Sequence, residues 1–294
     1  MRTPYSAAMK LGLIETEHGP QLAECALRDG VAQWSRICES LPADVVRAWD
    51  YRDRIETADR EPVADPRVLC PLDGSSTRVF CIGLNYRDHA RETNSPIPTA
   101  PIVFSKFASA LTHPGDPIVL PRVSDRVDFE AELVVVIGRE GKHITESHAL
   151  DHVFGYCCGH DVSARDWQKD KPGKQWLLGK TFDTFAPLGP FIATSDEVAD
   201  PHSLGVRCRI NGETMQDGTT ADLIFGVAEI VSYLSQVVRL QPGDVIFTGT
   251  PAGVGDARTP SRYLQDGDTV EVEIDGLGTL SNPVVAEDGA SIVS

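Results

Sequence analysis

The chain has 294 residues, of which 41% are hydrophobic, and a formal net charge of −16. This length and composition are typical of a globular protein with enough apolar residues for a core. The negative charge argues against nucleic acid and against anionic membrane surfaces as partners, because both are bound through Lys and Arg. A small anionic substrate remains compatible with it, since a local site can carry positive charge against the global sign.

No apolar run approaches the roughly 20 residues of a membrane helix, and the opening residues lack the apolar segment of a signal peptide. We therefore expect a cytoplasmic protein, although the basic and small opening residues leave organelle import open. The seven cysteines are scattered and odd in number. This pattern indicates buried, reduced thiols rather than disulfides or a zinc site.

Residues 1–74 predict a small α+β N-terminal domain. Two apolar runs around the turn at 17–20 indicate strands. Residues 31–41 and 42–55 are interpreted as helices, the second with a proline near its start. Residues 57–76 are rich in Pro, Asp and Ser, which is linker composition. The domain boundary is therefore placed between residues 74 and 75.

Residues 75–294 contain many short apolar runs separated by Gly and Pro, and one clear amphipathic helix within residues 221–238. Strands and helices do not alternate regularly. The sequence therefore predicts an α+β, mostly β fold, a barrel or a sandwich rather than a doubly wound sheet.

The segment "VDFEAELVVVIG" (127–138) begins a very apolar strand with Glu130 and Glu132. Residues two apart on a strand share a face, so the two carboxylates would repel each other if both were ionised. Arg126 could neutralise one of them, whereas a divalent cation such as Mg²⁺ or Ca²⁺ could serve both. The alternative is a pair of solvated acids on an edge strand.

Asp161 ends the next apolar run and is a candidate third oxygen ligand. It would equally suit the N-cap of a short helix beginning near Ser163. Three carboxylates would leave coordination positions of a cation open for water and substrate, as in a catalytic metal site.

Further polar residues are candidates for binding and catalysis. Arg165 and Gln168 lie one turn apart; Arg165 could clamp a substrate carboxylate or pair with Asp166 or Asp170. Lys180 could stabilise an oxyanion, or extend from the surface.

Two more candidate elements precede and follow these residues. His89 and Glu92 are three residues apart and could form a general base with the acid that orients it. The alternative is a His–Glu pair on the exposed surface of a helix without a catalytic role. The Gly-rich segment 247–255 could hold a substrate carboxylate through its backbone N–H groups and the Thr250 hydroxyl, or be a plain turn.

The motifs occur in the order "GLNYRDHARE", "FSKF", "VDFEAELVVVIG", "HDVSARDWQ", "KQWLLGKTFDTFAPLGP", "INGETMQDG" and "PGDVIFTGTPAGVG". In this order they resemble the fumarylacetoacetate hydrolase family over roughly residues 75–285. Within the family, the resemblance is greatest to the fumarylacetoacetate hydrolase domain-containing 2 type. The resemblance implies a mixed β-sandwich roll around a metal site, usually in a homodimer.

The resemblance also implies roles for individual residues. Glu130, Glu132 and Asp161 would be the metal ligands, and His89 with Glu92 the dyad that activates water or moves a proton. The residues expected to contact substrate are Lys180, which is also counted as catalytic, Arg165, Gln168, Thr250, Tyr86 and Gly249.

The chemistry that the resemblance implies is that of a small 2-oxo or β-dicarbonyl acid bound to Mg²⁺, with Mn²⁺ an acceptable substitute. The leading hypothesis is cleavage of a C–C bond through an enolate, either acylpyruvate hydrolysis or oxaloacetate decarboxylation. The alternatives are oxaloacetate keto–enol tautomerisation or isomerisation of a 2-hydroxy-diene-dioate. A hypothesis of another class is a non-catalytic metabolite-binding protein.

Overall fold

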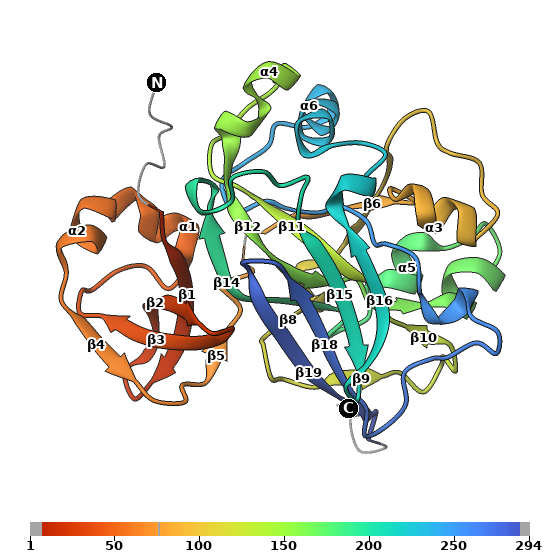
Figure 1. The fold of residues 1–294 in the computed structure, drawn as a ribbon, viewed down its shortest axis with the longest axis horizontal. Helices are drawn as coiled ribbons and strands as arrows, with labels where there is room; N and C mark the ends of the chain where they lie inside the picture. Colours follow the sequence, from red (N-terminus) through yellow and green to blue (C-terminus); the bar gives the residue numbers. More distant parts are fainter. Residues whose placement is uncertain (1–7, 76, 289–294) are drawn as a thin grey trace.

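Two β-sheets form the framework of the structure, a computed structural model that describes residues 8–75 and 77–288 (Figure 1). The larger sheet has the order β4-β3-β2-β1-β14-β12-β11-β17-β6-β7, with β5 beside β1 and β8 beside β14. Its strands are β1 (Lys10–Thr16), β2 (Gly19–Arg28), β3 (Val31–Ile37), β4 (Arg60–Val63), β5 (Val68–Leu69), β6 (Val79–Gly83), β7 (Ile102–Lys106), β8 (Leu111–Thr112), β11 (Ala131–Ile137), β12 (Val153–His160), β14 (Ala186–Thr194) and β17 (Val245–Phe247).

The smaller sheet has the order β16-β15-β18-β19-β9. Its strands are β9 (Ile118–Leu120), β15 (Gly205–Ile210), β16 (Glu213–Thr219), β18 (Thr269–Ile274) and β19 (Gly278–Ala286). A separate short pair joins β10 (Val127–Asp128) to β13 (Ser163–Ala164). The predicted fold class, mostly β with mixed sheets, is confirmed.

The helices are short. They are α1 (Val45–Ala48), α2 (Arg52–Thr57), α3 (Arg87–Glu92), α4 (Glu146–Ala149), α5 (Trp176–Lys180) and α6 (Val227–Val237). Single 3₁₀ turns are η1 (Trp49–Tyr51), η2 (Ala108–Ala110), η3 (Leu150–His152), η5 (Ser195–Glu197), η6 (Thr220–Asp222) and η7 (Gly255–Ala257), and η4 (Asp166–Asp170) is a π-helical turn. Within the described ranges, no helix has the length and apolar character needed to span a membrane.

Strand β11 lies at the centre of the larger sheet and is buried along its whole length. Its side chains alternate between two cores because successive residues of a strand point to opposite faces. Leu133, Val135 and Ile137 belong to the core shared with the smaller sheet. Val134 and Val136 belong to a second core on the other face. Glu132 continues the row of Val134 and Val136, so the fold carries this carboxylate into the protein interior.

The N-terminal segment joins the larger sheet through β1, which pairs antiparallel with β14 (Figure 1). The two strands expected around the turn at 17–20 are confirmed as β1 and β2. The division of the chain at residue 74 stays a prediction.

The helix expected at residues 31–41 is wrong, because residues 31–37 form strand β3 between β2 and β4. Val31, Trp34 and Ile37 are three residues apart, a spacing that imitates the helical period. The neighbouring strands decide the outcome by pairing with the backbone of β3 on both sides. The second expected helix is confirmed as the succession of α1, η1 and α2.

Gly155 in β12 provides a test of how closely β12 and β14 approach each other. A Cβ atom added at Gly155 would lie 2.1 Å from the carbonyl oxygen of Ala193. Since backbone cannot rotate away as a side chain can, we expect Gly155→Ala to lower the free energy of unfolding by about 3 kcal/mol, the upper range of overpacking. Urea denaturation followed by circular dichroism measures this, and an unchanged midpoint would contradict the observed strand spacing.

Candidate active site

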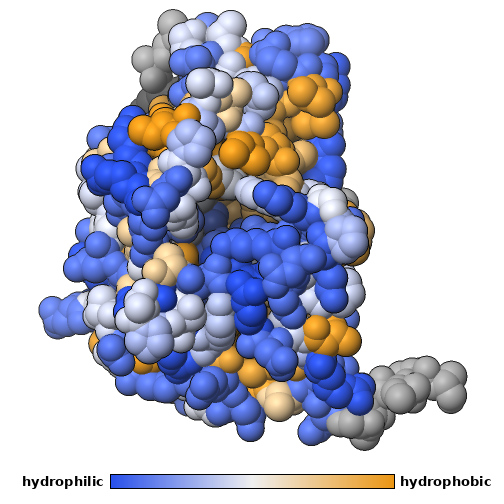
Figure 2. All heavy atoms as spheres, turned by 90° about the vertical axis from the view of Figure 1, so that its right-hand side faces the viewer, coloured by the Kyte–Doolittle hydropathy of each residue, from blue (hydrophilic) through white to orange (hydrophobic). Residues whose placement is uncertain are grey.

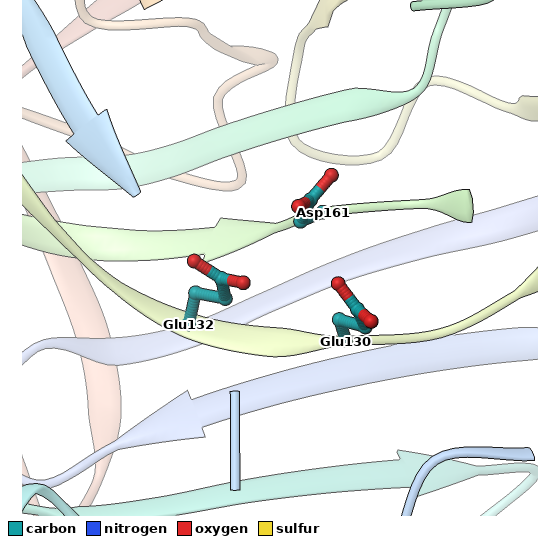
Figure 3. Close-up of side chains that lie close together, drawn as sticks. All are labelled: Glu130, Glu132 and Asp161. Carbon is teal, nitrogen blue, oxygen red and sulfur yellow. The ribbon is translucent and has the colours of Figure 1, made fainter. Parts of the chain in front are cut away.

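Glu130, Glu132 and Asp161 meet where β11 begins and β12 ends (Figure 3). The antiparallel register pairs Ala131 with His160, and the Asp161 N–H donates to the Glu130 carbonyl at 3.0 Å. One ligand atom from each of the three carboxylates can be chosen so that all lie within 4.8 Å of one another. The structure thus brings together the three predicted metal ligands, and all three are buried. The alternative of solvated acids on an edge strand is wrong.

Two lysines and one arginine pair with Glu130 and Asp161. Arg126 does not take this part, because its guanidinium pairs with Asp170 and Asp256. Lys180 donates to Glu130 and, at 2.8 Å, to Asp161 Oδ2. Burial alone would raise the pKa of Glu130, but Lys180 and Arg165 outweigh it and hold that pKa well below its usual value. Glu130 is therefore ionised in the interior.

Arg165 is buried and engaged by three side chains. Its Nε donates to Asp128 Oδ2 at 2.8 Å, and its terminal nitrogens donate to Glu130 Oε1 at 2.7 Å and Gln168 Oε1 at 2.9 Å. The alternative of a surface ion pair with Asp166 or Asp170 is therefore wrong. A guanidinium has five N–H groups, so two remain for other acceptors. The role of Arg165 and Gln168 in substrate binding stays a prediction.

The expected helix after Asp161 begins later than the sequence indicated. Ser163 and Ala164 form strand β13, and the helical residues are the π-turn Asp166–Asp170, which has Arg165 at its N-cap position. Asp161 is therefore not an N-cap, and its side chain serves the acidic cluster. Single π-turns are frequent at functional sites.

Charge in the buried cluster is unevenly balanced. Four buried carboxylates, Asp128, Glu130, Glu132 and Asp161, face three buried cations, Lys106, Arg165 and Lys180. Glu132 is the acid without a cationic partner: within the described part of the chain its carboxylate accepts one hydrogen bond, from the Gly249 N–H at 2.7 Å. Burial and the neighbouring Asp161 and Glu130 raise the pKa of Glu132 well above its usual value. One more cation, or one proton on Glu132, would therefore relieve the excess negative charge of the cluster.

The predicted dyad is formed on α3. His89 Nδ1 lies 3.1 Å from Glu92 Oε2, and Glu92 Oε1 accepts a hydrogen bond from the Gly253 N–H at 2.9 Å. A carboxylate can accept at this distance, so the contact favours the tautomer in which Nδ1 carries the proton and Nε2 keeps its lone pair. The His89 side chain is only 11% exposed and lines the same cavity as the acids. Nε2 is therefore the basic atom that the dyad offers.

The Gly-rich segment 247–255, together with the following Asp256, positions protein carboxylates through its backbone N–H groups. Besides Gly249 and Gly253, which donate to Glu132 and Glu92, Gly255 donates to Asp128 Oδ1 at 2.7 Å and Asp256 donates to Asp128 Oδ2 at 3.1 Å. Gly249 and Gly253 have φ angles of 102° and 108°, which other residues rarely adopt. The segment is thus an anion-binding loop whose observed anions are the protein's own side chains.

Two of the predicted substrate contacts, Gly249 and Thr250, have other partners in the structure, and a third, Tyr86, lies outside the cavity. The Gly249 N–H is used by Glu132, and the Thr250 hydroxyl donates to the Ala131 carbonyl at 2.9 Å. Tyr86 is fully buried, and its hydroxyl has no hydrogen-bond partner among the described residues. Thr250 lines the cavity, whereas Tyr86 and Gly249 do not. A substrate role for these three residues stays a prediction.

A cavity of about 410 Å³ opens over the acids. Its polar wall contains Glu130, Glu132, Asp161, Arg165, Gln168, Lys180, His89 and Glu92. Its apolar wall includes Ile102, Phe104 and Trp176, with the last two rings packed edge to face at 5.5 Å. The cavity lies toward the side that carries α3 and α5, and Figure 2 shows that this face is hollowed and bordered by both apolar and polar residues.

Sequence reasoning missed two residues of the cluster. Asp128 lies two positions before Glu130, so the same alternating pattern could have found it. It is fully buried and holds Arg165. Lys106 ends an edge strand and lies in the motif "FSKF" that contributes to the resemblance, but strand alternation alone does not distinguish it from a surface lysine.

The comparisons with known proteins agree with this geometry. The family profile described as "Fumarylacetoacetate (FAA) hydrolase C-terminal" matches residues 78–285. The chain belongs to the fumarylacetoacetate hydrolase family and is an enzyme. A relative from Bos taurus named mitochondrial oxaloacetate tautomerase FAHD2A is 55% identical over 97% of this chain and 95% of its own.

Other relatives and solved structures cover similar lengths. A fumarylacetoacetate hydrolase domain-containing protein 2 homolog of Dictyostelium discoideum is 50% identical over 76% of each chain. The crystal structure of a 2-hydroxyhepta-2,4-diene-1,7-dioate isomerase from Mycobacterium marinum is 37% identical, covers 95% of this chain and 99% of its own, and gives a TM-score of 0.77. A fumarylacetoacetate hydrolase from Exiguobacterium antarcticum gives 0.82 at 34% identity, covering 95% and 100%. The expected similarity to the domain-containing 2 type is confirmed.

The expected cytoplasmic location is contradicted by the relatives. The proteins from Xenopus laevis, Bos taurus and Homo sapiens are all named as mitochondrial. The sequence argument failed because a missing apolar segment argues only against secretion and membrane insertion.

The excess carboxylate predicts how cation binding depends on pH. A cation binds ionised Glu132, whereas the raised pKa favours its protonated form, so binding should release a proton. We expect the affinity for Mn²⁺ to rise up to about tenfold per pH unit below the pKa of Glu132. Calorimetric titrations in buffers of different ionisation enthalpy measure the released protons. Glu132→Gln should release none, and a pH-independent affinity of the unmodified protein would contradict the assignment.

Proposed function

We propose that this enzyme interconverts the keto and enol forms of oxaloacetate, or of a closely related 2-oxo acid, with a bound divalent cation. The observation that carries the proposal is that the His89–Glu92 dyad and Lys180 line the same cavity as the acidic triad. A base and an acid facing one substrate are what a proton shift between carbon and oxygen requires. The bovine relative's name supports oxaloacetate as the substrate.

The acidic triad fits a hard divalent cation. It offers only oxygen ligands, it is buried, and one of its carboxylates lacks a positive partner, which suits Mg²⁺ and equally Mn²⁺. Glu130, Glu132 and Asp161 would hold the ion. When bound, it would withdraw electron density from the keto group of the substrate and so make the adjacent C–H more acidic.

The side chains of the protein supply the proton movements. In the keto-to-enol direction, Nε2 of His89 takes a proton from C3 of oxaloacetate, and Glu92 stabilises the imidazolium that results. Negative charge develops on the C2 oxygen, and the Lys180 ammonium lies in the same cavity to stabilise it until the proton held by His89 reaches this oxygen and the neutral imidazole is restored. Burial alone would lower the pKa of Lys180, but Asp161 and Glu130 outweigh it and raise that pKa, so Lys180 stays charged. In the reverse reaction, His89 carries the proton from the C2 oxygen back to C3.

The remaining N–H groups of Arg165 are suited to the substrate carboxylate next to the keto group. With one divalent cation, the buried cluster of four carboxylates and three cations would carry a net charge of plus one. This charge complements an anionic 2-oxo acid despite the negative charge of the whole chain. We also propose that the enzyme is a homodimer, as the family resemblance implies.

C–C bond cleavage, the leading hypothesis from the sequence, is retained as a second candidate. The specific observation in its favour is the size of the cavity, about 410 Å³, with its apolar wall of Ile102, Phe104 and Trp176. A four-carbon acid would leave much of this space free, whereas an acylpyruvate and an attacking water would use more of it. In that reaction His89 would take the proton from water.

Oxaloacetate assays separate the two candidates. We expect the enzyme with Mg²⁺ to speed the decay of the ultraviolet absorbance of the enol, and EDTA to abolish the effect. Pyruvate measured at the end should equal that of an enzyme-free control containing Mg²⁺. Enzyme-dependent pyruvate release from oxaloacetate or acetylpyruvate would instead establish cleavage.

The dyad predicts a selective loss in a His89 variant. His89→Gln removes the basic Nε2 and should lower turnover by about a hundredfold or more, the usual contribution of a general base. Mn²⁺ affinity should stay the same, since His89 is outside the acidic triad. Arg91→Gln, at an exposed position of the same helix, is the matched control. Full turnover in His89→Gln would remove the dyad from the mechanism.

A further inference from the structure

Lys106 is a buried charge that the proposed reaction does not use. It is the last residue of β7, an edge strand whose other residues are exposed or half-buried. The Lys106 side chain is 0% exposed, and Lys106 does not line the cavity. Burying an ammonium ion costs several kcal/mol unless it is well paired. The partners of this ion are therefore informative.

Backbone carbonyls fix the position of the Lys106 ammonium. Its Nζ donates to the carbonyl oxygens of Val162 at 2.9 Å, Phe185 at 2.7 Å and Lys180. These acceptors come from three segments around the acidic cluster, and they match the three protons of an ammonium ion. The positive charge is thus held by backbone, which moves less than side chains do.

The same ammonium faces one oxygen of Asp161. Lys106 Nζ lies 2.7 Å from Asp161 Oδ1, while Asp161 Oδ2 accepts from Lys180, which also donates to Glu130. Oδ2 is therefore the oxygen on the Glu130 side, and Oδ1 is directed toward a cation outside the cavity. A carboxylate held in this way cannot rotate without losing a buried ion pair.

The contact with the Lys180 carbonyl extends the effect of Lys106. Lys180 closes α5, and its ammonium lies between Glu130 and Asp161. Because the Lys180 carbonyl accepts a hydrogen bond from the Lys106 ammonium, Lys106 also holds the backbone of Lys180 in place. Lys106 thus contacts both the Asp161 carboxylate and the backbone of Lys180, the lysine of the proposed reaction.

We propose that Lys106 is a positioning residue that turns Oδ1 of Asp161 away from the cavity, so that Asp161 binds a divalent cation through Oδ2 alone. This inference rests on the cation site of the proposed function. It does not depend on which reaction the enzyme performs, because cation binding is measured without substrate.

The test replaces Lys106 with methionine, which has similar length and no charge. We expect Lys106→Met to bind Mn²⁺ about tenfold to a hundredfold more weakly, the usual effect of losing a group that orients a metal ligand. Electron paramagnetic resonance measures free Mn²⁺ directly. Lys142→Met is the matched control, because Lys142 also donates to carbonyls, those of Gln236 and Val237, but is only half-buried and contacts no acid of the site.

A vibrational signature distinguishes positioning from general damage. Carboxylate stretches of protein labelled with ¹³C at the aspartate carboxyl differ between one-oxygen and two-oxygen coordination. The band that disappears in Asp161→Asn should show one-oxygen coordination in the unmodified protein and two-oxygen coordination in Lys106→Met. If Lys106→Met does not fold by circular dichroism, Lys106→Gln keeps a donor without charge and should show the same change more weakly.

Each outcome is decisive. Unchanged Mn²⁺ affinity and an unchanged band in a folded Lys106 variant would overturn the inference and leave the proposed function standing. Mn²⁺ binding by the unmodified protein without oxaloacetate turnover would overturn only the reaction. No Mn²⁺ binding by the unmodified protein would overturn both.

Discussion

The surplus of one carboxylate in a buried cluster is the constraint on which the site depends. Asp128, Glu130, Glu132 and Asp161 cannot all be ionised against only Lys106, Arg165 and Lys180 without strong repulsion at Glu132. The protein can meet this with a proton or with a cation. The arrangement that makes Glu132 hard to ionise would therefore also favour a divalent ion at its carboxylate, because the ion would offset the repulsion.

The other charged residues of the cluster are paired with one another, so the excess negative charge is confined to Glu132. Arg165 and Lys180 hold Glu130 ionised, and the two lysines hold the two oxygens of Asp161. The Gly-rich loop supports the acids from a third side through backbone N–H groups. Because the loop also holds Glu92, the His89–Glu92 dyad on α3 and the acidic triad share one support. Under the proposed function, a shift of that loop would disturb cation binding and proton transfer together.

Proteins similar to this chain are named for different reactions, and the two walls of the cavity are compatible with such variety. Under the proposed function, the polar wall would present the triad, the dyad and Lys180 to the reacting end of a substrate, and the apolar wall of Ile102, Phe104 and Trp176 would face the remainder. The chemistry of the reacting end is set by buried groups that the fold holds in place. The distal end is free to vary, and fold alone does not determine the reaction.

Local periodicity made several features predictable from the sequence alone. The same-face placement of Glu130 and Glu132 follows from the strand period, and the contact between His89 and Glu92 from the helical period. The mostly β class followed from many short apolar runs. The same local reasoning failed at β3, where the spacing of Trp34 and Ile37 suited a helix but β2 and β4 paired with the backbone.

Tertiary structure alone decided which charges meet. Lys180 and Arg165 reach Glu130 from 50 and 35 residues away, and Lys106 reaches the segment after Asp161 from 56 residues away. Arg126, near in sequence, pairs elsewhere. These partnerships depend on the register of β11 against β12 and on where β7 and α5 pack, which no local pattern encodes. The sequence by itself determined which acids share a face, and the packing of distant segments determined which cations neutralise them and which carboxylate is left for a cation to bind.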